Sequence, residues 1–134
     1  MKEKIKIYIF GNPLLSFDSI PIKLIPELKN RFPQIDFIQK DPNENLKPNN
    51  KELVIIDTAM GIKEVKEFED IEKIETENIY SPHDFDLAFN IKLLQKIGEL
   101  EKVTIFGVPP KIKKQEAFNQ LSCLIENYSN SRSS

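Results

Sequence analysis

Cysteine, histidine and glycine are all scarce in this chain of 134 residues, and each shortage excludes certain bonds or binding sites. Cys123 is the only cysteine, so no internal disulfide can form, and we expect a protein of the reducing cytoplasm. We interpret Cys123 as a buried structural thiol rather than a nucleophile. His83 is the only histidine, which excludes a second metal site built on histidine. The four glycines do not form a dinucleotide fingerprint or a P-loop.

Long apolar runs and blocks of like charge are also missing. No apolar stretch is long enough to span a bilayer, and the opening residues Met1–Lys4 run into a strand-like segment without the features of a signal peptide. The 21 acidic and 19 basic side chains nearly balance, at a net charge of −2. Without a basic block, nucleic-acid binding is not indicated. We therefore expect a cytoplasmic protein without membrane insertion and without a nucleic-acid partner.

Apolar, β-rich runs alternate with helical patterns along the chain. Strands are predicted at five short runs rich in β-branched and aromatic residues, namely 5–10, 35–38, 53–56, 65–68 and 103–106. Helices are predicted at 20–30, 82–97 and 115–128. This alternation predicts an α/β fold, a three-layer sandwich. Its central sheet should be mostly parallel or mixed, with about five strands and helices on both faces.

Individual residues predict where these helices begin, bend and end. Ser19 can cap the first helix, in which Pro26 should cause a kink or a later start. Ser81 can cap the second helix, and Gly98 should close it. The core-facing side of this second helix is predicted to carry Phe85, Ala88, Phe89, Leu93 and Ile97. Residues 1–128 should form a single domain, followed by a flexible polar tail at 129–134.

Three residues with metal-binding side chains fall at the ends of predicted elements. Asp18 lies in the connection after the first strand, Asp57 ends the central strand, and His83 lies in the first turn of a helix. Because ligands of such sheets bind outside the carboxyl ends of the strands, we expect all three at one edge. Two carboxylates and one imidazole suit a borderline divalent metal such as nickel, zinc, iron or manganese, with coordination positions left open.

Each of the three residues also has a plainer interpretation. Asp18 suits a turn or a cap, Asp57 can simply end a strand, and His83 can be a surface histidine. Taken singly, these interpretations are the stronger ones. Only the convergence of the three at one sheet edge favours a metal site.

Four segments of the chain together resemble the hydrogenase maturation proteases, the endopeptidases that trim the large subunit of nickel–iron hydrogenases. The first, Gly11–Asp18, is similar to the family's Gly-Asn opening motif that ends in acids. The second, 54–59, is similar to a strand that ends in an acid, and the third, 81–87, to a Ser-x-His helix start. The fourth, 103–110, is similar to a later strand that leads to a Gly-x-x-Pro turn. The resemblance extends from the first strand through the last helix, and it rests on the order and spacing of these segments.

The resemblance implies a sandwich of the phosphorylase/hydrolase-like kind, an activity, a substrate and a set of site residues. The implied protein is a nickel-dependent endopeptidase that removes a C-terminal extension from the large-subunit precursor after nickel insertion. Asp18, Asp57 and His83 would be its metal-binding and catalytic residues. They would recognise nickel that the precursor already holds, and another divalent metal would occupy the site in vitro. Nickel acting as a Lewis acid and a carboxylate acting as general base both remain open. We expect a monomer.

The substrate side of the site departs from the family. Gly11 and Asn12 suit a close backbone approach to the substrate peptide, but Phe17 replaces one of the family's paired acids. The family's Asp-Gly-Gly-Thr segment reads Gln39–Pro42 here, where Asp41 is the candidate replacement for the missing acid. These departures indicate a divergent branch, with an archaeal source favoured. They leave open a second function, a non-proteolytic assembly factor that binds the hydrogenase.

Overall fold

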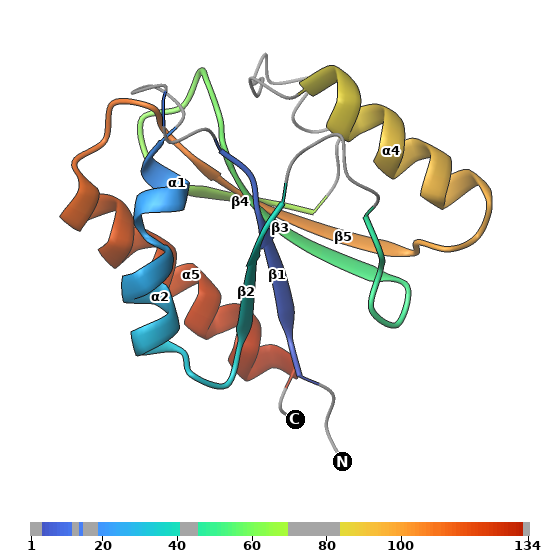
Figure 1. Cartoon of the computed structure of the whole chain (residues 1–134), viewed down its shortest axis with the longest axis horizontal. Helices are drawn as coiled ribbons and strands as arrows, with labels where there is room; N and C mark the ends of the chain where they lie inside the picture. Colours follow the sequence, from blue (N-terminus) through green and yellow to red (C-terminus); the bar gives the residue numbers. More distant parts are fainter. Residues whose placement is uncertain (1–3, 12–13, 15–18, 41–45, 70–83, 133–134) are drawn as a thin grey trace.

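All of the described strands belong to one five-stranded sheet (Figure 1). The computed structural model describes residues 4–11, 14, 19–40, 46–69 and 84–132. Four strands are parallel, β1 (Lys6–Ile9), β2 (Asp36–Gln39), β3 (Glu52–Thr58) and β5 (Lys102–Val108). The edge strand β4 (Lys66–Phe68) is antiparallel to β5, and the order is β2-β1-β3-β5-β4. The predicted α/β fold with a mixed, mostly parallel sheet is therefore confirmed.

Helices cover both faces of this sheet, as predicted. The short helices α1 (Ile20–Lys23) and α2 (Ile25–Arg31) lie with α5 (Lys114–Arg132) on one face, and α4 (Asp84–Lys96) lies on the other (Figure 1). The side chains of β3 alternate between the two cores, with Val54 and Ile56 on the α5 side. A strand covered on both faces has to be apolar throughout, which explains the uninterrupted run from Leu53 to Ile56. In the described ranges, no helix is both long and apolar enough to cross a membrane.

Pro26 divides the first predicted helix in two, as expected. α1 ends at Lys23 and α2 begins at Ile25, so Pro26 lies in the first turn of α2, where a backbone N–H would have no helical partner. Leu24 joins the two helices, and its N–H still donates to the carbonyl oxygen of Ile20 at 3.1 Å. Ser19 occupies the N-cap position of α1 as predicted, although its side chain forms no capping hydrogen bond.

The end of α4 was predicted correctly, but its buried face was not. Gly98 has a φ of +80°, and the N–H groups of Gly98 and Glu99 donate to the carbonyl oxygens of Gln95 and Leu94 at 3.2 and 3.0 Å. This pattern of two bonds is a Schellman motif, which glycine favours. The sheet is contacted by Ile91, which is fully buried, and by Leu94, whereas the predicted core residues Phe89, Leu93 and Ile97 are exposed. Phe85 and Ala88 lie outside the described side chains.

The last helix is longer than predicted. Its buried face contains Leu121, Ile125 and Tyr128, and α5 continues beyond the predicted end to Arg132. Residues 129–132 are therefore helical rather than a frayed tail, and 133–134 lie outside the described residues. Cys123 is exposed, so its interpretation as a buried thiol was wrong. Cys123 lies two residues from Leu121, about 200° around the helix, and thus on the opposite face.

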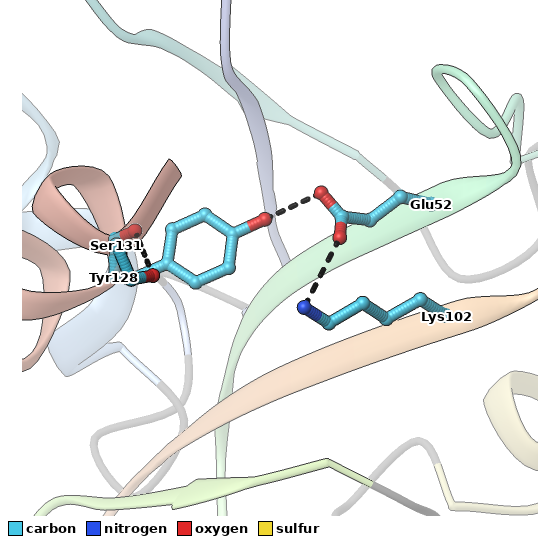
Figure 2. Close-up of polar contacts among 4 residues, drawn as sticks. All are labelled: Glu52, Lys102, Tyr128 and Ser131. Atoms are coloured by element: carbon cyan, nitrogen blue, oxygen red, sulfur yellow. Dashed lines mark hydrogen bonds and ion pairs between the residues drawn. The ribbon is translucent and has the colours of Figure 1, made fainter. Parts of the chain in front are cut away.

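A polar network ties the end of α5 to the amino ends of β3 and β5 (Figure 2). The Tyr128 hydroxyl donates to Glu52 Oε1 at 2.5 Å, and Lys102 Nζ lies 3.8 Å from Glu52 Oε2. The Glu52 side chain is only 11% exposed, so burial makes the loss of either partner costly. Tyr128 also packs edge-on against Phe106, with ring centroids 6.2 Å apart. The network thus fixes the position of α5 over the sheet.

Replacing Tyr128 with phenylalanine tests this network. Tyr128→Phe keeps the ring contact but removes the hydroxyl that donates to the Glu52 carboxylate, and we expect a loss of about 1–3 kcal/mol in the free energy of unfolding. Urea denaturation would measure it. Ser131→Ala is the matched control, since it removes a hydroxyl that donates to the Tyr128 carbonyl oxygen at 2.9 Å, and should cost less than about 1 kcal/mol. Equal effects of the two substitutions would contradict the assigned role of Tyr128.

Candidate functional site at the carboxyl edge of the sheet

The carboxyl ends of three parallel strands meet at one edge of the sheet. Ile9, the last residue of β1, pairs with Ile56 of β3, and Thr58 at the end of β3 pairs with Val108 at the end of β5. The pairing continues one step past β1, since the Phe10 N–H donates to the Ile56 carbonyl oxygen at 3.0 Å. Gly11 follows directly and is partly buried. This is the edge at which the sequence predicted a site.

Asp57 is a buried carboxylate at this edge, with 2% of its surface exposed. It does not end its strand as the plainer interpretation held, because β3 continues through Thr58. Since side chains alternate along a strand, Asp57 points to the same face as Leu53 and Ile55, the face covered by α4. Its Oδ1 accepts a hydrogen bond from the backbone N–H of Thr58 at 2.8 Å. A buried carboxylate needs such donors, and this bond fixes the position of the side chain.

Gly107 is the residue of β5 that lies beside Asp57 in the parallel register. A Cβ atom built on Gly107 would lie 2.8 Å from the Ala59 Cβ and 3.2 Å from a ring carbon of Phe68. Only glycine at position 107 therefore allows the side chains of Ala59 and Phe68 to pack against β5 next to Asp57. The sequence analysis took Gly107 as the start of a turn, although a glycine inside a strand often marks such a close approach.

Thr58 adds a second buried polar group at the end of β3. It is 1% exposed, and in the part of the chain that the structure describes its Oγ1 has no hydrogen-bond partner. Alternation places this side chain on the opposite face from Asp57, the face covered by α1. Leaving a hydroxyl buried without a partner is unfavourable by about 1–3 kcal/mol. Sequence reasoning did not single out Thr58, because a threonine near a strand end is common.

Two of the predicted site residues lie within the described structure. Asp57 is the last residue but one of β3, and Gly11 follows the neighbouring strand β1, two residues after Ile9. The other predicted residues, Asn12, Asp18, Asp41 and His83, lie outside the described residues, so the metal trio stays a prediction. Among the described residues, no three or more histidine, cysteine or acidic side chains cluster closely enough to hold a metal.

The elements that follow Asp18 and His83 in the sequence are described. Ser19 is buried and immediately precedes α1, a helix that packs against β3. Asp84 begins α4, which covers the face to which Asp57 points. The connections that contain Asp18 and His83 therefore lead into helices that pack on β3, the strand of Asp57, and on the strands beside it.

A second polar region lies between β4, β5 and α5, where a cavity of about 150 Å³ is lined by Glu67, Glu69, Lys102, Thr104, Asn127, Tyr128 and Ser131. Partial burial raises the pKa of Glu67 above its ordinary value of 4.5, the neighbouring Glu69 carboxylate raises it further, and Lys102 opposes both effects. The folded protein thus binds this proton more tightly than the unfolded chain does. Lys102 is the first residue of β5, so this cavity lies toward the amino end of that strand, away from Asp57.

A substitution at Gly107 tests the close approach beside Asp57. Gly107→Ala places a Cβ within 2.8 Å of the Ala59 Cβ, and we expect it to lower the free energy of unfolding by about 1–3 kcal/mol. Adding Ala59→Gly should restore part of the loss, because it removes the atom in conflict. Thermal or urea unfolding of the two variants would show this. No recovery in the double variant would contradict the steric explanation.

The raised pKa of Glu67 predicts a pH-dependent stability. Because the folded state binds this proton more tightly than the unfolded chain, the contribution of Glu67 is most favourable below about pH 4 and is lost as the pH rises through its folded pKa. Glu67→Gln should therefore be more stable than the wild type at pH 7, by less than about 1 kcal/mol because the side chain is exposed. The difference should vanish at low pH in denaturation curves. Glu69→Gln should give part of the same gain.

Comparisons with known proteins bear on the fold of this chain. No family model matches the sequence, and no curated protein does. The structure is similar to the crystal structure of an uncharacterized protein from Wolinella succinogenes, with a TM-score of 0.56 and 13% sequence identity over 98% of each chain. At that identity the likeness shows a shared fold alone, extending over nearly the whole of both chains.

Proposed function

We propose that this chain is a nickel-dependent endopeptidase that removes the C-terminal extension of a nickel–iron hydrogenase large-subunit precursor. The observation that carries the proposal is the position of Asp57. It is a buried acid at the carboxyl end of the central strand, beside the end of β1 and Gly11. The resemblance to hydrogenase maturation proteases assigns a metal-recognising acid to this residue. A carboxylate that is held by a backbone N–H in this way is prepared to meet a cation.

In this proposal the nickel arrives as part of the substrate. Asp18, Asp57 and His83 would provide the oxygen and nitrogen ligands that nickel accepts, each at the start or end of an element. Gly11 and Asn12 would lie along the substrate peptide, and Asp41 would take the place of the family's substrate-contacting acid. The proposal has two alternative mechanisms. In one, the substrate's nickel would polarise the scissile carbonyl or lower the pKa of a water molecule. In the other, Asp18 or Asp57 would act as the general base and accept a proton from the attacking water.

The proposal includes a setting for this reaction. The partner is the hydrogenase large-subunit precursor, and the reaction takes place in the cytoplasm with the protease as a monomer. A single cysteine and the near balance of charge agree with that setting. Since the site reads a metal held by another protein, resident metal is not required, although another divalent metal would occupy it in vitro.

A second candidate, a non-proteolytic factor that binds the hydrogenase during assembly, is favoured by the residues after β2. Where the family has its glycine-rich substrate segment, the Lys40 N–H donates to the Ile9 carbonyl oxygen at 3.0 Å. The Lys40 ammonium also lies 5.8 Å from the centre of the Tyr8 ring. The chain therefore stays attached to β1 at this point, which suits docking better than threading of a peptide.

A cleavage assay distinguishes the two candidates. Purified protein should shorten a nickel-loaded large-subunit precursor and leave the nickel-free precursor intact, as measured by intact-protein mass spectrometry. Asp57→Asn and His83→Ala should each slow cleavage by about 100-fold or more, because each removes a group that acts on the metal or on the proton. The Asp57→Asn side chain keeps an oxygen that can accept the Thr58 N–H, so unfolding temperature should report that this variant folds.

The control for this assay is Cys123→Ser, which alters an exposed side chain on α5 and should cleave at the wild-type rate. Full activity of His83→Ala would show that metal recognition is assigned wrongly. Stable binding of the precursor with no change in its mass would favour the assembly factor.

A further inference from the structure

The cavity of about 150 Å³ between β4, β5 and α5 is separate from the candidate site, and we call it the β4–α5 cavity. It has room for several water molecules, and hence for a ligand of fewer than about ten non-hydrogen atoms. Every side chain that lines it is polar. Two acids come from β4 and the residue after it, Lys102 and Thr104 come from β5, and Asn127, Tyr128 and Ser131 come from α5.

The register of the sheet turns the two acids, Glu67 and Glu69, toward α5. Glu67 pairs with Phe106, whose side chain belongs to the buried cluster on the α5 side. Because paired residues of antiparallel strands share a face, Glu67 lies on that side too, and Glu69, two residues later, lies on the same face. Thr104 comes two residues before Phe106 and therefore also faces α5.

The two carboxylates carry negative charge that their surroundings do not balance. The lining includes one basic residue, Lys102, but its ammonium points toward Glu52 and lies 3.8 Å from Glu52 Oε2 (Figure 2). Within the described ranges, no basic side chain forms an ion pair with Glu67 or Glu69. Partial burial and the Glu69 carboxylate raise the pKa of Glu67, and Lys102 offsets them only in part. The cavity therefore favours a cation.

Neutral polar groups complete the lining. Thr104 is only 1% exposed, yet its side chain lines the cavity, and it forms no hydrogen bond with another side chain or loop of the described structure. A buried hydroxyl without a partner is unfavourable, and a polar group of a ligand would provide that partner. The Asn127 amide offers both donors and an acceptor. With a wholly polar lining, the cavity suits a short polar ligand rather than a long aliphatic one.

A bare metal ion fits this lining less well than an ammonium group does. Among the described residues, no three or more histidine, cysteine or acidic side chains lie close enough together to hold a metal. An ammonium group donates three hydrogen bonds and needs only acceptors around it. Its bonds to carboxylates are charge-assisted, which makes them stronger than bonds between neutral groups.

We propose that the β4–α5 cavity binds a small primary amine that also carries a hydroxyl group. Its ammonium would donate to the carboxylates of Glu67 and Glu69, and its hydroxyl would bond to Thr104 and Asn127. This proposal goes beyond the proposed function and does not rest on it.

Three small cations test the proposal with the whole chain. Ethanolamine is the probe, choline has the same charge and hydroxyl but no N–H donor, and n-butylamine has the ammonium but an apolar stem in place of the hydroxyl. Each is titrated into isotope-labelled protein at constant ionic strength and followed by NMR. Ethanolamine should shift amide resonances around the cavity and bind about tenfold more tightly than choline or n-butylamine.

Substitutions assign the binding to the named groups. Glu67→Gln keeps the shape of the side chain and removes its charge, so it should weaken ethanolamine binding about tenfold. Glu99→Gln is the matched control, since it removes the same charge from an exposed residue after α4 and should bind as the wild type does. Thr104→Val removes the hydroxyl at nearly constant volume and should bring the affinities for ethanolamine and n-butylamine to within about threefold.

Several results would overturn the proposal. Equal binding of choline would show attraction by charge alone, and tighter binding of n-butylamine would assign the cavity to the lysine side chain of another protein. The same shifts caused by magnesium at lower concentration would assign the two carboxylates to a metal. An absence of localised shifts with ethanolamine at about 10 mM would exclude a site of useful affinity. The precursor-cleavage assay is read separately, so a failure here does not bear on the proposed protease activity.

Discussion

The parallel pairing of β3 with β5 is the constraint on which the rest of this structure depends. The two strands pair over seven residues without a break, from Glu52 with Lys102 to Thr58 with Val108. Every residue of both strands except the first is buried. Because both faces of this central pair are apolar, each face requires a covering layer, and the helices of the two outer layers follow from that need. A slip of one residue would turn the side chains of either strand to the wrong faces.

The same register determines where polar chemistry can occur. Polar side chains on β3 are confined to its two ends, with Glu52 at the first residue and Asp57 and Thr58 at the last two. The amino end is used for stability, since Glu52 holds Tyr128 and Lys102 (Figure 2). The carboxyl end holds Asp57 beside Gly107, at the edge where α/β sheets bind ligands. Stability and the candidate site therefore occupy opposite ends of one strand.

The two helical layers differ in how completely they are themselves covered. The side with α1, α2 and α5 has the larger buried cluster, to which residues of all three helices contribute. On the other side, α4 has an inner contact through Ile91 and an outer face that leaves Phe89 and Leu93 in solvent. The edge that carries Asp57 and the outer face of α4 are thus separate surfaces.

The sequence by itself determined the type and order of the elements and some of their boundaries, because those signals are local. The apolar run at Leu53–Ile56 predicted the central strand, Pro26 predicted the break after α1, and Gly98 predicted the end of α4. The position of Asp57 at the carboxyl edge followed from the strand pattern together with the general rule for parallel sheets. The convergence of Asp18 and His83 with Asp57 remains a prediction, since those two residues lie outside the described structure.

Tertiary structure decided which faces are buried and which residues are close. The periodicity of α4 predicts apolar faces but not which of them contacts the sheet. In the folded protein, Ile91 and Leu94 make this contact. The roles of Gly107 and Thr58 appear only once β3 and β5 are paired, because the atoms that surround them come from distant parts of the chain. Cys123 is exposed for the same kind of reason, since packing of α5 used the opposite face. Local sequence specifies the backbone, whereas burial depends on which neighbours the whole fold brings together.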